Sequence, residues 1–119
     1  MRSHNNLDAW KRSMDLVVDI DRITDNFPKE EKFGLTSQLR RADVSIPANI
    51  AEGAARKYSK EFDRFLSNAQ GSASEVETEL MIAFRLGYLA ANEFEDLSRN
   101  LDDIGRMITG LSKYLKRSI

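Results

Sequence analysis

Apolar residues recur every three or four positions along almost the whole chain, which is the period of an amphipathic helix. Four such segments are separated by short breaks, and no segment alternates with period two over the length of a strand. We therefore predict an all-α protein with helices over about 7–25, 30–55, 59–89 and 92–117. Long amphipathic helices with short connections favour an antiparallel up-down-up-down four-helix bundle, as one domain over residues 1–119. A helical solenoid is the alternative, but no repeat of about 30 to 45 residues is visible.

The breaks between these segments carry helix-ending and capping residues. Pro28 ends the first helix, because the residue before a proline is pushed out of the α region. The acidic pair at 30–31 suits the positive end of the second helix. Ser59 is the expected N-cap of the third helix, and Asn92 followed by Glu95 resembles a capping box for the fourth.

The most ordered pattern lies in the second helix, in SQLRRADVSIPANIAEG from Ser37 to Gly53. An apolar stripe there consists of Leu39, Ala42, Ile46 and Ile50, and a polar stripe beside it consists of Arg41, Ser45, Asn49, Glu52 and Arg56. Pro47 lies in the middle and predicts a kink or a short break, with the Ser45 hydroxyl available to cap freed backbone groups. Gly53 is either a close-packing point or a C-terminal stop.

The polar stripe borders the apolar one rather than lying opposite it, so its groups are expected at the edge of a packing interface. Glu75 and Glu79, one turn apart on the third helix, are suited to pair with arginines of the stripe. We therefore predict a polar network that fixes helix register or subunit contacts. Its members are Arg41, Ser45, Asn49, Glu52, Arg56, Glu75 and Glu79.

Charge is small in total but uneven along the chain. The formal net charge of -1 gives the whole molecule no strong attraction to nucleic acid or anionic lipid. Basic residues dominate 40–64 and 104–119, whereas acidic residues dominate 71–103. The candidate nucleic-acid contacts are Arg40, Arg41, Arg56, Lys57, Lys60 and Arg64. Three interpretations of these basic residues stay open: solvated helix-end charges, the polar network, and contact with the phosphate backbone of RNA or DNA.

Nothing in the sequence predicts a catalytic, cofactor or metal site. The one histidine, His4, lies before the first helix, and a di-metal bundle would need Glu-x-x-His pairs. The chain has no cysteine, which excludes disulfides and thiolate ligands and fits a reducing cytoplasm. No apolar run is long enough for a secretory signal or a membrane span. We expect a cytoplasmic, non-enzymatic protein without cofactor, small-molecule substrate or membrane association.

The apolar surface is wider than one core seam requires, so we expect self-association. The first helix has one stripe and a second beside it: Leu16, Ile20 and Ile23, then Trp10, Met14 and Val17. Phe33, Tyr58 and Tyr88 lie near helix ends and are candidate interface anchors.

Several motifs in chain order resemble one known family. They are Trp10-Lys11 with the following LVVDIDRIT, Phe27-Pro28, SQLRRADVSIPANIAEG, the Ser59–Phe62 segment with Arg64-Phe65-Leu66, and Leu86-Gly87-Tyr88-Leu89. The chain resembles the bacterial four-helix-bundle proteins encoded within 23S ribosomal RNA intervening sequences, over about 7–115. It departs from that pattern at Asp21, where an aromatic residue is usual, and at Asp43, where a small apolar residue is usual.

The resemblance implies an up-down bundle that assembles as a ring, a homopentamer. It also implies kinship with the accessory protein of diversity-generating retroelements, a basic pentamer that associates with reverse transcriptase and nucleic acid. The function we expect is a non-enzymatic, oligomeric interaction or scaffold module. The alternative is a nucleic-acid-binding accessory factor associated with ribosomal RNA or a ribonucleoprotein.

Overall fold

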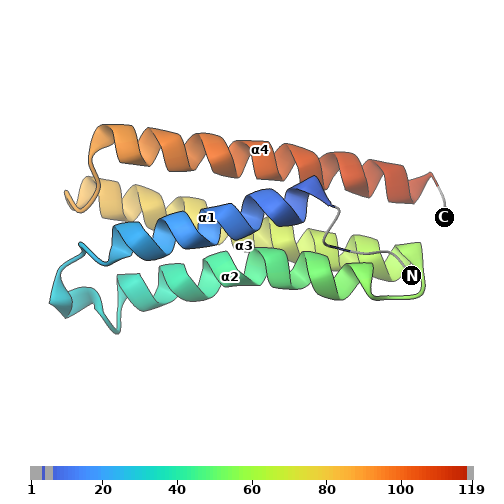
Figure 1. Cartoon of the computed structure of the whole chain (residues 1–119), viewed down its shortest axis with the longest axis horizontal. Helices are drawn as coiled ribbons and strands as arrows, with labels where there is room; N and C mark the ends of the chain where they lie inside the picture. Colours follow the sequence, from blue (N-terminus) through green and yellow to red (C-terminus); the bar gives the residue numbers. More distant parts are fainter. Residues whose placement is uncertain (1–3, 5–6, 118–119) are drawn as a thin grey trace.

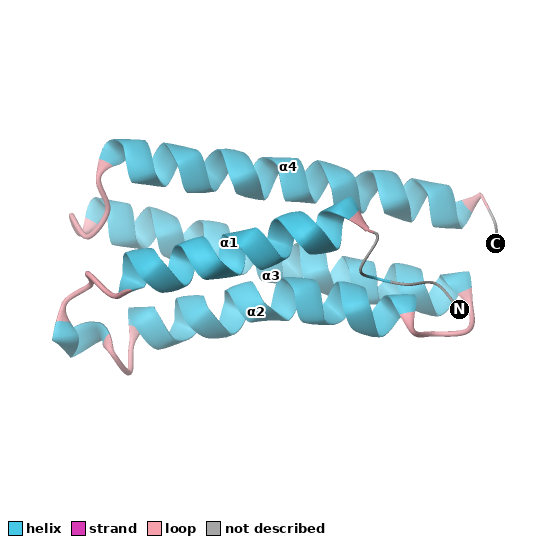
Figure 2. Cartoon of the chain, in the orientation of Figure 1, coloured by secondary structure: helices cyan, strands magenta, loops and turns pink. Residues whose placement is uncertain are grey.

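The chain folds into a bundle of four long helices. The computed structural model describes residue 4 and residues 7–117, and in this part it contains α1 (Asp8–Thr24), α2 (Leu35–Ala54), α3 (Ser59–Arg85), α4 (Ala91–Lys116) and no strand. A 3-10 helix, η2 (Lys29–Glu31), precedes α2. Successive helices run in opposite directions, and α4 closes the bundle by packing against α1 (Figures 1 and 2). The predicted all-α antiparallel bundle is confirmed.

One apolar stripe from each helix forms the core. Because residues three and four apart share a helix face, the stripes read from the sequence meet along the bundle axis. The largest fully buried side chains include Leu16, Ile20, Leu39, Ile46, Ile50, Phe62, Leu66, Leu80, Ile104 and Ile108. The contact between α2 and α3 is the most extensive of the four.

The wide apolar face of α1 is mostly used within the chain. Leu16 and Ile20 are buried, and Trp10, Val17 and Ile23 are half-buried, because α1 packs against both α2 and α4. Met14 alone of the two predicted stripes is exposed, at 41%. The expectation that this face stays open for assembly is therefore wrong for most of its residues.

The second helix begins five residues later than predicted, at Leu35 rather than at 30, because the chain first makes η2 and a turn. Glu31 nevertheless caps it: its Oε1 accepts a hydrogen bond of 3.1 Å from the Leu35 N–H. Its Oε2 accepts one of 3.0 Å from the Tyr88 hydroxyl, and the Tyr88 ring lies 5.4 Å from that of Phe27. Glu31 thus ties the start of α2 to the turn between α3 and α4.

Two further helix ends differ from the expected positions. The N-cap of α3 is Tyr58, not Ser59. The N-cap of α4 is Ala90, whose N–H donates to Glu93 Oε1 at 2.9 Å, so the capping carboxylate lies two residues before the predicted Glu95. The third helix ends at Arg85, short of the predicted 89, and Gly87 follows it at φ 82, a left-handed conformation that favours glycine.

Helix α2 runs through Pro47 without interruption. A kink or a short break was expected at this proline, and the short break does not occur. The Ser45 hydroxyl does not cap the backbone freed by Pro47, since its hydrogen-bond partners are Asn49 and Ser72. Gly53 is a close-packing point: a Cβ placed there would lie 2.8 Å from Phe62 Cδ1 and from Phe65 Cβ on α3.

Candidate functional site

Part of the predicted polar network joins α2 to α3. The Ser45 and Ser72 hydroxyl oxygens lie 2.8 Å apart, across the two helices. The Asn49 amide nitrogen donates to the Ser45 carbonyl oxygen at 2.8 Å and to its hydroxyl at 3.0 Å. All three residues are half-buried at the border of the core, as the position of the stripe predicts. Ser72, however, was not among the predicted members.

The charged members do not pair across these helices within one chain. Arg41 and Glu75 are exposed, and among the described residues no ion pair joins Arg41 to Glu75 or Glu79. Glu79 is buried, with 7% exposed, and its Oε1 has no hydrogen-bond partner. Burial, and then the neighbouring Glu75, raise the pKa of Glu79. The α2–α3 seam therefore holds a buried acceptor without a cation.

Glu52, in the last turn of α2, and Arg56, just after the helix, form a local pair. Their side chains lie 3.4 Å apart across one helical turn, and both are largely exposed. The Arg56 guanidinium also lies 4.8 Å from the centre of the Phe65 ring on α3, in the range of a cation–π contact. Arg56 thus contributes to the α2–α3 contact through stacking rather than through the predicted acidic partners.

Arg40 is held by α1. Its Nε donates to Thr24 Oγ1 at 2.9 Å, and its Nη2 donates to the Asp21 carbonyl at 3.1 Å and to Asp25 Oδ1 at 3.0 Å. Its Nε also lies 3.4 Å from Asp21 Oδ1. Arg40 therefore connects two helices.

Asp43 lies on the same side of α2 as Arg40. It is 1% exposed, and its Oδ1 has no hydrogen-bond partner. Burial raises the pKa of Asp43 to about 7, and the charges of Asp21 and Glu79 act in the same direction, while the Val44 backbone and Arg40 oppose them. A carboxyl group in this position changes its charge near neutral pH.

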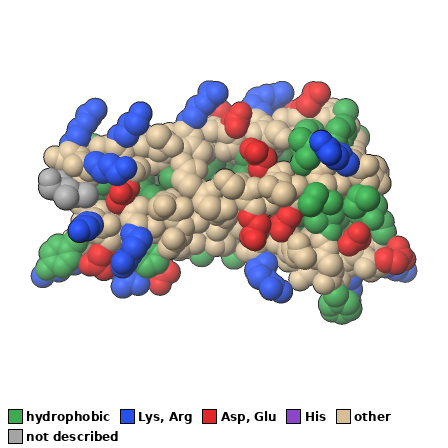
Figure 3. Space-filling view, turned by 180° about the vertical axis from the view of Figure 1, so that it is seen from behind, with side chains coloured by type: hydrophobic (Ala, Val, Ile, Leu, Met, Phe, Trp, Pro, Cys, Tyr) green, Lys and Arg blue, Asp and Glu red, His purple; other side chains and the backbone are tan. Residues whose placement is uncertain are grey.

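The remaining basic candidates gather at one end of the molecule. Lys57, Lys60 and Arg64 are exposed in the α2–α3 turn and the first turns of α3. The last turn of α4 reaches the same end and adds Lys113, Lys116 and Arg117. Figure 3, seen from behind, shows this concentration of lysine and arginine at its left end. A surface hollow of about 600 Å³ opens there beside Tyr58, Lys60 and Arg64.

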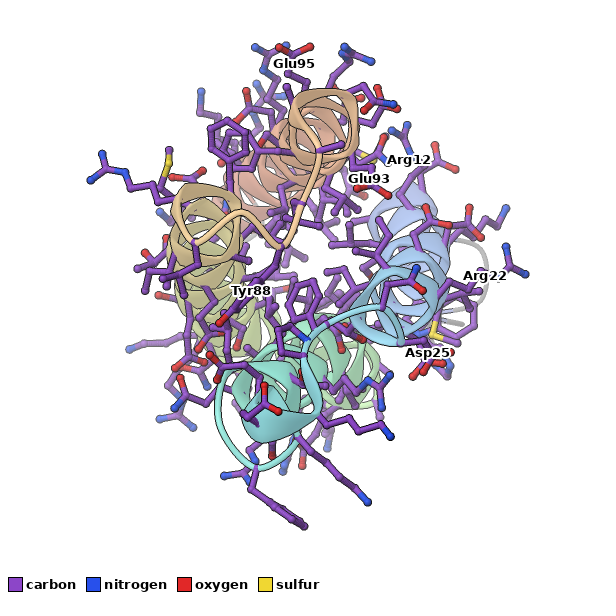
Figure 4. The ribbon with its side chains drawn as sticks, turned by 90° about the vertical axis from the view of Figure 1, so that its left-hand side faces the viewer. Arg12, Arg22, Asp25, Tyr88, Glu93 and Glu95 are labelled. Atoms are coloured by element: carbon purple, nitrogen blue, oxygen red, sulfur yellow. The ribbon has the colours of Figure 1, made fainter. Side chains whose placement is uncertain are left out.

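The opposite end carries both signs of charge. It contains the end of α1, η2, and the start of α4, with exposed or half-buried carboxylates at Asp25, Glu30, Glu93 and Glu95 and exposed cations at Arg22, Lys29, Lys32 and Arg85. In the end-on view of Figure 4, Asp25 and Glu95 point away from the bundle. The excess of basic side chains at the end with the α2–α3 turn therefore has no clear counterpart of opposite sign at the other end of the 46 Å bundle.

The described residues contain no group of three or more histidine, cysteine or acidic side chains that could hold a metal ion. None of their helices is long and apolar enough to cross a membrane. His4 lies edge-on against Trp10, with 4.9 Å between the ring centres.

Two features escaped prediction for identifiable reasons. The basic cluster at the end of α4 is visible in the sequence, but its position beside the α2–α3 turn follows only from the up-down topology. Arg40 and Asp43 are three positions apart in the sequence, so they are expected on the same face of α2. Only the packing of α1 shows that Arg40 is bound to α1 and that Asp43 is buried.

Comparisons with known proteins agree with this architecture. The fold matches the crystal structure of a protein of unknown function from the S23 ribosomal protein family of Bacteroides thetaiotaomicron VPI-5482, with a TM-score of 0.79 and 23% identity over 88% of this chain and 98% of that one. The comparison with curated proteins finds no match. The sequence model described as "23S rRNA-intervening sequence protein" matches residues 5–110. The chain therefore belongs to the family of 23S rRNA-intervening sequence proteins.

Proposed function

We propose that this protein is a non-enzymatic interaction module that works as an assembly of its own copies. The observation that carries the proposal is the exposed apolar surface near the end of α3, where Met81, Ile82 and Leu86 expose 38%, 44% and 55%. Figure 3 shows hydrophobic side chains gathered at that end of the molecule. Apolar side chains that cluster on a surface are typical of protein–protein contacts, whereas scattered ones are not.

The α2–α3 seam supports the same proposal. Glu79 has a buried carboxylate oxygen without a partner, and Arg41 is an exposed arginine on α2. A second copy that brings an arginine to Glu79 would satisfy a group that one chain leaves without a partner. In this assembly the polar network is completed between subunits. We propose a ring, with five subunits as the number that the family resemblance implies, acting in the cytoplasm without a small-molecule substrate.

Multi-angle light scattering over a range of protein concentrations tests the assembly. The double variant Ile82→Gln with Leu86→Gln should weaken association by about tenfold or more, because it removes two apolar contacts, each worth about 1 kcal/mol. The matched control is Tyr114→Gln, which replaces an aromatic side chain on α4, 62% exposed, by the same polar residue. Circular dichroism verifies that both variants fold. A monomeric wild type at micromolar concentration would contradict the proposal.

A second candidate function is nucleic-acid binding through the basic end. The observation that favours it is the hollow lined by Tyr58, Lys60 and Arg64, which Glu61 and Asp63 also line. Basic side chains that follow a phosphate backbone, next to an aromatic ring on which a base stacks, are typical of single-stranded nucleic-acid sites.

Titration of a ribosomal RNA fragment at two salt concentrations tests this candidate. Contacts with phosphates give an affinity that falls steeply with salt. Lys60→Gln with Arg64→Gln should lower the affinity and flatten that dependence, whereas Arg40→Gln should change neither, since Arg40 is bound to α1. Binding that is insensitive to salt would exclude the basic end as the site.

A further inference from the structure

A single arginine lies between two sets of acidic groups at the α1–α2 contact. On one side, the Arg40 guanidinium bonds to the last turn of α1, through Thr24, the Asp21 carbonyl and Asp25, at 2.9 to 3.1 Å. On the other side, three residues along the same helix, lies the buried Asp43, with one carboxylate oxygen lacking a partner. Residues three apart on a helix are neighbours, so the guanidinium can reach either side by rotating its side chain.

The two sides differ in what an unpaired charge costs. Asp21 and Asp25 are exposed, with side chains 64% and 73% accessible, so water solvates them when the arginine leaves. Asp43 is 1% exposed, and an ionised carboxylate there has neither water nor a hydrogen bond at Oδ1. Once Asp43 loses its proton, pairing of Arg40 with Asp43 therefore stabilises the protein more than pairing of Arg40 with α1.

The charged groups that act on Asp43 come from all the helices packed against it. They are Asp21 of α1, Arg40 of α2 and Glu79 of α3, while α4 packs on α1 and α3 rather than on α2. Two of the three are acids, and with the burial they raise the pKa of Asp43 to about 7. The proton therefore leaves within the physiological range.

We propose that Arg40 is a proton-controlled latch between α1 and α2. While Asp43 is protonated, the guanidinium holds the last turn of α1. When Asp43 ionises, the guanidinium turns toward it and releases Thr24 and Asp25. The core contacts of Leu16 and Ile20 keep the rest of α1 in place, so the change is confined to its C-terminal turn and the connection to η2.

The test measures the pKa of Asp43 by carboxyl-carbon NMR in the full chain and in Asp25→Asn. Asp25 is not among the groups that act directly on Asp43, so its removal reaches Asp43 only by freeing Arg40. The pKa of Asp43 should fall by about 1 in Asp25→Asn, as expected for closer approach of an arginine. The matched control is Asp15→Asn, which removes the same charge from an exposed position of α1, and should leave Asp43 nearly unchanged.

A second measurement follows the latch itself. Amide hydrogen exchange of residues 21–25, corrected for intrinsic chemistry, should accelerate severalfold between pH 6 and pH 8 in the wild type. It should not accelerate in Asp43→Asn, which has no charge to form. Equal pKa values of Asp43 in Asp25→Asn and Asp15→Asn would overturn the proposal. Exchange at residues 21–25 that is independent of pH would overturn it as well.

Discussion

Buried carboxyl groups dominate the energetics at the scale of single residues. Asp43 and Glu79 each leave a carboxylate oxygen without a partner inside the bundle. An ionised group in this position is costly, and proteins resolve the cost by pairing the charge or by keeping the group protonated. Burial raises the pKa of both groups, that of Asp43 to about 7.

The pH dependence of stability should reveal Asp43. An acid whose pKa is raised in the folded state stabilises the fold fully below its ordinary pKa of 3.8, and this contribution is lost as the pH rises through about 7. Asp43→Asn should therefore be more stable than the wild type at pH 8, by about 1–2 kcal/mol. This is less than the pKa difference alone implies, because solvent screens part of the cluster and the amide is itself polar.

Urea unfolding at pH 4, 6 and 8 measures this difference. The advantage of Asp43→Asn should shrink toward pH 4, where the wild-type carboxyl is protonated in the folded state. Asp15→Asn supplies the control for loss of one acidic group from an exposed site. A constant difference at all three pH values would show that Asp43 does not titrate in this range.

A second titration checks the junction between η2 and the α3–α4 turn. The hydrogen bond to Glu31, together with burial, raises the pKa of Tyr88. The Glu31 carboxylate accepts a hydrogen bond from the phenol O–H and thereby stabilises the protonated, neutral form of Tyr88. Glu31→Gln should lower the pKa of Tyr88, followed by NMR of the ring. Glu30→Gln removes the same charge from the adjacent residue, which has no such bond, and should lower it less. Equal effects would indicate that general electrostatics, not the hydrogen bond, sets this pKa.

Among the helices, the α2–α3 contact depends on close approach at Gly53. A methyl group at this position would lie 2.8 Å from Phe62 Cδ1 and 3.2 Å from the Phe62 carbonyl oxygen, which belongs to the backbone and cannot yield easily. The same approach places Arg56 over Phe65. The glycine is therefore required by packing between two helices rather than by its own backbone conformation.

Gly53→Ala should destabilise the protein by about 1–3 kcal/mol, the usual cost of overpacking a tight contact. Gly71→Ala is a matched control, because Gly71 lies inside α3 with nothing within 4 Å of the added carbon. Alanine there should stabilise the helix by about 0.5–1 kcal/mol. Chemical denaturation of the two variants compares the effects, and a neutral Gly53→Ala would mean that the helices separate without cost.

The helices were predictable from the sequence because each core stripe is regular, as in Leu39, Ile46 and Ile50 of α2. The helix ends were less predictable: the acidic pair at 30–31 indicates a nearby helix start, but not that η2 and a turn delay that start to Leu35, whose N–H donates to the Glu31 carboxylate. The sequence places Ser45 and Asn49 at the border of the core, but their partner Ser72 depends on the register between helices. Asp43 is buried by tertiary contacts, including the packing of α1, and the sequence pattern of α2 does not show these contacts.

At the scale of the whole molecule, basic side chains are concentrated at one end of the bundle. The α2–α3 turn and the end of α4 are basic (Figure 3), whereas the end with η2 carries both signs of charge. The net charge of -1 hides this concentration. In a ring of parallel copies, all basic ends would lie on one face, and their fields would add where a single chain presents only a few lysines and arginines.

Assembly and nucleic-acid binding should therefore be coupled. The Ile82→Gln with Leu86→Gln variant leaves the basic end unchanged, since these residues lie near the C-terminal end of α3 and the basic cluster lies at its start. If copies act together, this variant should bind RNA at least about tenfold more weakly than the wild type, because linked sites gain avidity. Its affinity should also depend less on salt, because each RNA then contacts fewer basic ends.

Fluorescence titration with one RNA fragment at 50 and 200 mM salt measures both quantities, with Val18→Gln, an exposed apolar position of α1 outside the basic cluster, as the control that keeps net charge. Weaker RNA binding with a flatter salt dependence in the assembly variant alone would join the two candidate functions into one mechanism. If instead the assembly variant loses association but keeps its RNA affinity, each basic end binds by itself, and a ring has no role in nucleic-acid binding. No RNA binding by either protein leaves the self-assembled scaffold as the function that the exposed end of α3 supports.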